Sequence, residues 1–193
     1  VIKKGDKVVV RANACWAVQP DTGIASDPRV VEALMRLIRD ETKPREVVVA
    51  DRSSIGADTA ESFRVTGIAE AALRGGADRI LPLEQDQRVA IQVPQPMVLF
   101  QPVFLSKTML EAEVLIYLAK MKTHKLTQIS LTLKMNQGSL DWYDAIRNHR
   151  ADDLILALQV DAADAACVAA NRPGLRLVEP NRHAVARAQH HLV

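Results

Sequence analysis

The feature that most constrains the fold is a series of short β-branched segments separated by helix-forming ones. The first, Lys7–Asn13, follows a Gly-Asp turn, the second is EVVVAD at 46–51, and a third covers 80–83. Continuous apolar runs of this length are typical of strands that are buried on both faces. The order strand, helix, strand, helix, strand therefore predicts a parallel sheet with right-handed crossovers.

The helices between these strands are predicted from their capping residues. Asp27 followed by proline marks the start of a helix that we expect to extend to about Asp40. Asp58 and Glu61 have the spacing of a capping box and predict a second helix, interrupted at Gly67 and ending near residues 75–76. The predicted inward face of the first helix comprises Val30, Leu34, Leu37 and Ile38.

The second half of the chain departs from this alternation. Extended, proline-containing runs with no helix between them predict a short antiparallel excursion near residues 88–105. A buried strand returns at 113–118, and we expect a helix within 152–170, a last strand at 175–178 and a helix capped by Asn181. Overall we predict a three-layer α/β fold with a mostly parallel sheet, forming a single domain over residues 1–193.

The composition excludes several classes of function. A net charge of +2 and an aromatic content of 4% argue against a nucleic-acid partner. No apolar run approaches the roughly 20 residues that span a bilayer, so we expect no membrane segment. Cys15 and Cys167 form no C-x-x-C pair, which predicts no metal site and no iron–sulphur cluster held by this chain alone. The reduced thiols and the charged opening VIKKGDKVVV predict a cytoplasmic protein, with its cofactor unknown.

Polar side chains follow three of the predicted strands. Ligands of open α/β sheets bind beyond the carboxyl ends of the strands, so we expect these side chains to form one crevice for an anionic small molecule. We predict that His124 and Lys122 are catalytic. The predicted ligand-binding residues are Arg11, Asn13, Asp51, Ser53, Ser54, Thr123, Thr127 and Lys134.

The segment 120–136, KMKTHKLTQISLTLKMN, carries most of this chemistry. Extended geometry would place Lys122 and His124 on one side, where they could hold a phosphate or carboxylate while His124 exchanges a proton. On composition alone, a solvated basic loop fits as well. Residues 126–135 fit both a strand and a helix, and under either interpretation Lys134 leaves the apolar face.

Two further features have open alternatives. Ser53-Ser-Ile-Gly56 before a capped helix is either an anion-binding nest or a plain turn between strand and helix. Asp51 could bind a metal or a ribose hydroxyl, or it could accept hydrogen bonds from nearby amides.

These motifs, in order along the chain, resemble a known family. The similar stretches are GDKVVVRAN at 5–13, DPRVVEAL at 27–34, VVVADRSS at 47–54, KMKTH at 120–124 and the pair Leu133-Lys134. They are similar to the uncharacterised family named domain of unknown function 362, over about residues 5–150. The resemblance implies a bacterial or archaeal α/β domain, often linked to ferredoxin-like 4Fe–4S modules, and hence a redox connection.

The chain departs from the family pattern at three places. The usual Lys-Pro-Asn after the first strand appears as Arg11-Ala-Asn13, and the later Lys-Asn pair appears as Lys134-Met-Asn136. Beyond about residue 150 the likeness thins, because Leu177-Val-Glu-Pro180 stands where we expect a strand ending in Val-Asp-Gly.

Three hypotheses for function follow. The first is binding of an anionic small molecule or cofactor, in redox metabolism. The second is a non-catalytic module that docks on an iron–sulphur or electron-transfer protein through its basic edge. The third is a family member that keeps the fold without activity. Convergence of Lys122, His124, Lys134 and Asp51 in a cleft favours the first, whereas a flat arrangement favours docking.

Overall fold

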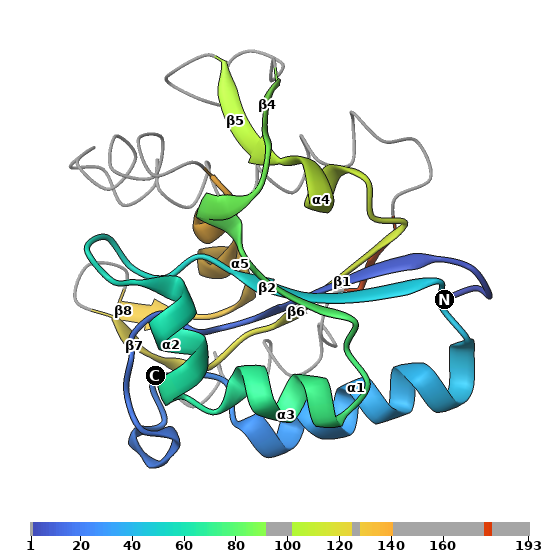
Figure 1. Ribbon diagram of the computed structural model, residues 1–193. Helices are drawn as coiled ribbons and strands as arrows, with labels where there is room; N and C mark the ends of the chain where they lie inside the picture. The colour runs from blue at the N-terminus through green and yellow to red at the C-terminus, as the bar shows by residue number, and fades with distance from the viewer. Residues whose placement is uncertain (1, 92–101, 125–127, 141–175, 179–193) are drawn as a thin grey trace, which may run out of the picture.

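A parallel sheet forms the centre of the protein (Figure 1), and it consists of five strands. The computed structural model describes residues 2–91, 102–124, 128–140 and 176–178. The strand order is β3-β2-β1-β6-β9, and every neighbouring pair is parallel. The strands are β1 (Lys7–Ala12), β2 (Glu46–Asp51), β3 (Arg79–Pro82), β6 (Val114–Leu118) and β9 (Arg176–Val178). The predicted parallel sheet is therefore confirmed.

Three helices cover one face of this sheet: α1 (Pro28–Thr42), α2 (Thr59–Val65) and α3 (Ile68–Arg74). Alternate residues of the strands point toward them and form one apolar cluster. That cluster includes Val8, Val10, Val47, Val49, Met35, Ile38, Phe63 and Ile68. α3 approaches α1 closely at Gly75, where a Cβ atom would lie 2.6 Å from the Cβ of Met35.

The helix boundaries follow the predicted caps, but the inward face of α1 differs from the prediction. The Asp27 carboxylate accepts from the Arg29 N–H at 2.9 Å, and the Asp58 carboxylate accepts from the Glu61 N–H at 3.0 Å. Val30 and Leu37 are about half exposed, so their predicted burial was wrong. Ile38 is buried as predicted, and Val31 and Met35 are buried in place of the other two. Apolar residues flank this stripe on both sides, which made two rotations of the helix fit the sequence pattern.

The other face of the sheet is covered by shorter elements. β4 (Arg88–Ile91) and β5 (Val103–Ser106) pair antiparallel, which confirms the predicted excursion. They pack with α4 (Lys107–Leu110) and α5 (Thr132–Asn136) over a second apolar cluster. This cluster includes Val9, Val48, Leu115, Leu105, Met109, Met135 and Leu140. The sheet thus lies between two covering layers, as the predicted three-layer α/β fold requires.

The segment that fitted both a strand and a helix contains one of each. β7 (Lys122–His124) pairs antiparallel with β8 (Gln128–Ser130), and α5 begins two residues after β8. Lys134 lies in the helical part. Three short 3₁₀ turns complete the described elements: η1 (Pro20–Thr22), η2 (Leu83–Gln85) and η3 (Gln137–Ser139).

Several predictions for the end of the chain lie outside the described residues. These are the helix within 152–170 and the cap at Asn181. The last predicted strand is confirmed as β9, which pairs with β6. The single-domain organisation stays a prediction. Within the described ranges, no helix has the length and apolar character needed to cross a membrane.

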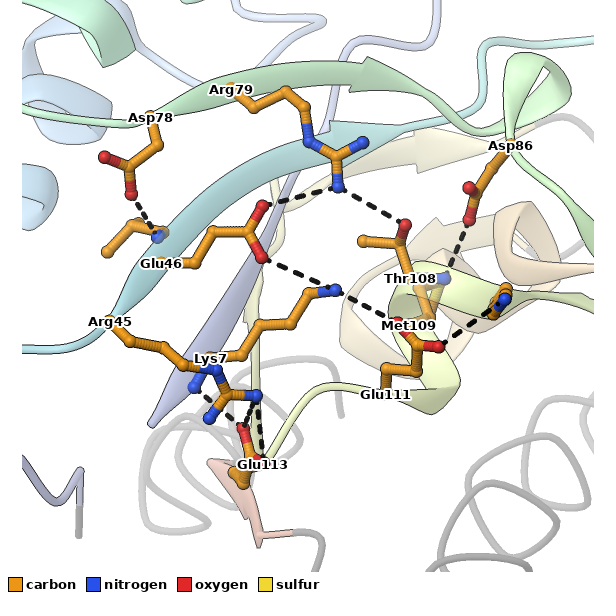
Figure 2. Close-up of polar contacts among 12 residues, drawn as sticks. Lys7, Arg45, Glu46, Asp78, Arg79, Asp86, Thr108, Met109, Glu111 and Glu113 are labelled. Atoms are coloured by element: carbon orange, nitrogen blue, oxygen red, sulfur yellow. Dashed lines mark hydrogen bonds and ion pairs between the residues drawn. The ribbon is translucent and has the colours of Figure 1, made fainter. Parts of the chain in front are cut away.

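The amino-terminal ends of the strands carry a network of ion pairs, shown in Figure 2. The Lys7 ammonium lies 3.5 Å from the Glu46 carboxylate and 3.4 Å from the Glu111 carboxylate. Arg45 pairs with Glu113 at 3.0 Å, and the Glu113 carboxylate also accepts from the Lys7 N–H at 2.7 Å. Each of these carboxylates therefore has a cation beside it.

Candidate functional site

A cavity of about 710 Å³ lies at the carboxyl ends of β1 and β2. The loops after these strands and the β7–β8 hairpin gather at the left end of the molecule in Figure 1, whereas the N-terminus lies at the right. This is the edge at which ligands bind to open parallel sheets. The volume is within the usual range for small-molecule pockets, about 300–1,000 Å³.

The structure brings most of the predicted site residues to this cavity. Thr127 lies outside the described residues, so its place is not given. The nine predicted residues that line the cavity are Arg11, Asn13, Asp51, Ser53, Ser54, Lys122, Thr123, His124 and Lys134.

A buried ion pair forms the floor of the cavity. The Arg11 side chain is fully buried and donates through Nη2 to the Asp51 carboxylate, which is 2% exposed as a residue. The other Asp51 oxygen accepts from the Ala14 N–H at 2.7 Å. Because β1 and β2 are neighbours, their ends place these opposite charges side by side. Asp51 thus accepts a hydrogen bond from a backbone amide, which was one of the two alternatives predicted for it.

The Arg11 guanidinium also binds the segment that covers the second face. Its Nη1 donates to the Met135 carbonyl oxygen at 2.8 Å and to the Ser139 hydroxyl at 2.5 Å. Its central carbon lies 5.7 Å from the ring centroid of Tyr117, its register neighbour on β6. Among the described residues, Arg11 Nε has no hydrogen-bond partner. Arg11 therefore connects β1, β2 and the α5–η3 segment.

Gly138 permits this approach. A Cβ atom at this position would lie 2.6 Å from Arg11 Nη2 and 3.4 Å from the Arg52 carbonyl oxygen. Real Cβ atoms do not sit that close to a heavy atom, so a side chain here would push the guanidinium out of place. The glycine is needed for space, and it lines the cavity together with Arg11.

Lys122 is held by three acceptors from the loop after β1. Its ammonium group lies 2.8 Å from each of Asn13 Oδ1, Cys15 Sγ and the Ile24 carbonyl oxygen. A lysine ammonium has three N–H donors, and these contacts account for all three. The hairpin is thereby joined to the β1–α1 loop.

The first two N–H groups of Ser53-Ser-Ile-Gly56 donate to protein oxygens. The Ser53 N–H donates to the Thr59 hydroxyl at 2.9 Å, and the Ser54 N–H donates to the Cys15 carbonyl oxygen at 2.9 Å. The Ala57 N–H donates to the Ser54 carbonyl oxygen, also at 2.9 Å. These groups close a turn, so the plain-turn interpretation is favoured over an anion-binding nest.

The electrostatics of the cavity act on His124. Burial and the positive charges of Lys134 and Lys122 lower the pKa of His124 below its ordinary value. A cation disfavours a second positive charge nearby. Among the described residues, the lining contains four cationic side chains, Arg11, Arg52, Lys122 and Lys134, and one carboxylate, that of Asp51. The cavity therefore has an excess of positive charge, which an anion would balance.

The donor set does not resemble a metal centre. Among the residues that the structure describes, no group of three or more histidine, cysteine, aspartate or glutamate side chains could hold a metal ion.

Sequence reasoning missed part of the lining. Trp16, Thr22, Gly23, Ile24 and Ile55 come from irregular loops, where no hydrophobic period marks them. Cys15 and Arg52 belong to the polar strand ends that were expected to form the crevice, but they were not among the predicted ligand-binding residues. The remaining missed residues are Ser130, Met135 and Gly138.

Comparison with known structures shows a related fold. The lactate racemase apoprotein from Thermoanaerobacterium thermosaccharolyticum matches with a TM-score of 0.57 and 15% sequence identity. The match covers 88% of this chain and 41% of the racemase chain, so this chain spans less than half of that protein's length. At this identity the likeness shows the fold alone. The comparison with curated proteins found no match.

The family comparison extends further along the chain than we predicted. The sequence model described as Domain of unknown function (DUF362) matches residues 8–181, beyond the expected limit near residue 150. The C-terminal part is therefore included in the likeness despite its altered motif. The chain belongs to the DUF362 family.

Proposed function

We propose that this protein binds an anionic small molecule in the cavity at the carboxyl ends of β1 and β2. The observation that carries the proposal is the convergence of Lys122, His124 and Lys134 on one concave site above the Arg11–Asp51 pair. A concave site with excess positive charge favours a small anion over a flat protein surface.

The residues divide into two roles. Arg11, Asp51 and Lys122 use their polar groups mainly on the protein itself and act as positioning residues with fixed charge. His124 and Lys134 contact the ligand. Because burial and the two lysines lower its pKa, His124 favours the neutral form, which can accept a proton from a bound substrate.

The fold likeness to the lactate racemase apoprotein shows the fold alone, so the proposal rests on the geometry of the cavity. A role in redox metabolism and docking on an iron–sulphur protein stay predictions from the family resemblance, and neither is needed for anion binding.

The proposal is tested by calorimetric titration of the whole chain with sulfate at low ionic strength. Replacing Lys134 by glutamine removes a cavity charge and is expected to weaken binding at least about fivefold, because a charge pair near 4 Å is worth about 1 kcal/mol or more. Lys107→Gln is the matched control, since Lys107 lies on α4 outside the cavity lining. Equal affinities of the two variants would contradict the proposal.

A further inference from the structure

Among the described residues, three exposed apolar side chains share the cavity lining with the cations. Trp16 is 47% exposed, Ile55 41% and Ile24 36%. Single exposed apolar residues are common on protein surfaces, but a group of them within one pocket is typical of ligand contact. The cavity therefore has two kinds of lining, one charged and one apolar.

Hydrogen bonds hold the apolar group beside the charged one. Lys122 Nζ bonds to the Ile24 carbonyl oxygen and to Cys15 Sγ, and Trp16 follows Cys15 in the chain. The Cys15 carbonyl oxygen accepts from the Ser54 N–H, and Ile55 follows Ser54. Ile24 therefore takes part in these hydrogen bonds itself, and Trp16 and Ile55 each follow a residue that does.

The cavity is much larger than a simple inorganic anion. A water molecule takes about 30 Å³ of liquid volume, and a sulfate or acetate ion is only a few times larger. Such an ion would leave most of the roughly 710 Å³ to water and would leave the apolar lining without contact. A ligand that fills the site needs an apolar body as well as a charge.

We propose that the ligand is an organic anion that carries an aromatic ring system. This inference rests on the proposed function and names the class of its ligand. The acidic group faces Lys134 and His124, and the ring lies against Trp16, Ile24 and Ile55. Trp16 is the specificity-determining residue, because offset stacking on an indole favours flat rings over aliphatic groups of equal charge.

The test is a calorimetric comparison of methanesulfonate, benzenesulfonate and 2-naphthalenesulfonate on the full chain. All three carry one negative charge, so differences in affinity report the body of the ligand. We expect affinity to rise at each step, by at least about tenfold from the methyl to the naphthyl compound. Trp16→Ala should remove most of this increase, because it removes the indole on which the rings stack.

Control variants separate the alternatives. Ile55→Ala reduces the apolar lining at a second position. Leu37→Ala removes an exposed apolar side chain of α1 that does not line the cavity, so it should not change the affinity for any of the sulfonates. Thermal unfolding of each variant checks that it is folded.

Three results would overturn the inference. Equal affinity for the three sulfonates would reject the aromatic ligand while leaving anion binding intact. An equal loss for all three in Trp16→Ala would give Trp16 a purely structural role. Absence of binding by all three sulfonates, together with no binding of sulfate, would reject this inference and the proposed function together.

Discussion

The two ends of the central sheet differ in how their charged side chains are paired. At the amino end, Lys7 and Arg45 lie within 3.5 Å of glutamate carboxylates. At the carboxyl end, the described part of the chain lines a cavity with four cationic side chains and one carboxylate. Opposite charges that balance each other locally maintain a fold, whereas an unbalanced set in a concave site is suited to a ligand. The comparison places the proposed function at one end and structural support at the other.

Two aspartates allow a matched test of this difference. Asp51 pairs with Arg11 and accepts from the Ala14 N–H, while Asp78 pairs with Arg39 and accepts from the Val47 N–H. The Asp51 pair is buried, but the Asp78 side chain is about half exposed.

The largest expected effect is therefore that of Asp51→Ala. It leaves the Arg11 charge buried without its carboxylate, and we expect the free energy of unfolding to fall by about 3–5 kcal/mol. Asp78→Ala should cost about 1–2 kcal/mol, because solvent screens the exposed pair. Urea denaturation measures both. Similar costs for the two variants would show that burial does not distinguish the two ends.

The next effect concerns the space above Arg11. Gly138→Ala places a methyl group against the guanidinium, and we expect a cost of about 1–3 kcal/mol from the forced displacement, with weaker sulfate binding. Gly56→Ala is the control, since a Cβ at Gly56 meets no atom within 4 Å and suffers only from the positive φ of 84°. That strain costs about 1–2 kcal/mol and should leave sulfate affinity unchanged. An unaltered affinity in Gly138→Ala would argue against a role for the Arg11 position in binding.

The smallest effect is expected at the amino end. Glu113→Gln removes one charge from the network in Figure 2 and should cost about 1 kcal/mol or less, because the glutamine oxygen can still accept from the Lys7 N–H. Sulfate affinity, measured by calorimetry, should not change. A loss of affinity comparable to that of Lys134→Gln would remove the functional distinction between the two ends.

The sequence predicted the helices and strands better than the contacts between residues that are far apart in the chain. The strands at 7–12 and 46–51 and the caps at Asp27 and Asp58 were predictable, because they depend on residues close together in the chain. The gathering of polar residues at one edge followed from parallel strand order.

The pairings within the site could not be predicted in the same way. The lysine at 122 contacts Cys15 across 107 residues, and Arg11 contacts Ser139 across 128, so neither contact leaves a local pattern. Arg11 and Asp51 were both predicted as ligand-binding residues, yet the sequence did not show that they bind each other. The apolar lining at Trp16 comes from an irregular loop with no periodicity to reveal it.

The pH dependence of His124 links stability to binding. Because the folded-state pKa lies below the unfolded value, the unfolded chain binds more protons as pH falls below about 6.5, and His124 then destabilises the fold. Above that pH the effect disappears. A bound anion offsets the charges of Lys134 and Lys122 and should raise the pKa of His124, so binding should strengthen as pH falls.

The most direct test of the central claim is therefore the pKa of His124, measured by NMR titration with and without sulfate between about pH 5 and 8. Sulfate stays doubly charged over this range, so a change in the measured pKa comes from His124 and not from titration of the sulfate. Binding in the cavity predicts a clear rise of the pKa on adding sulfate, reduced in Lys134→Gln and retained in Glu113→Gln. The same pKa with and without saturating sulfate would contradict an anion site at His124.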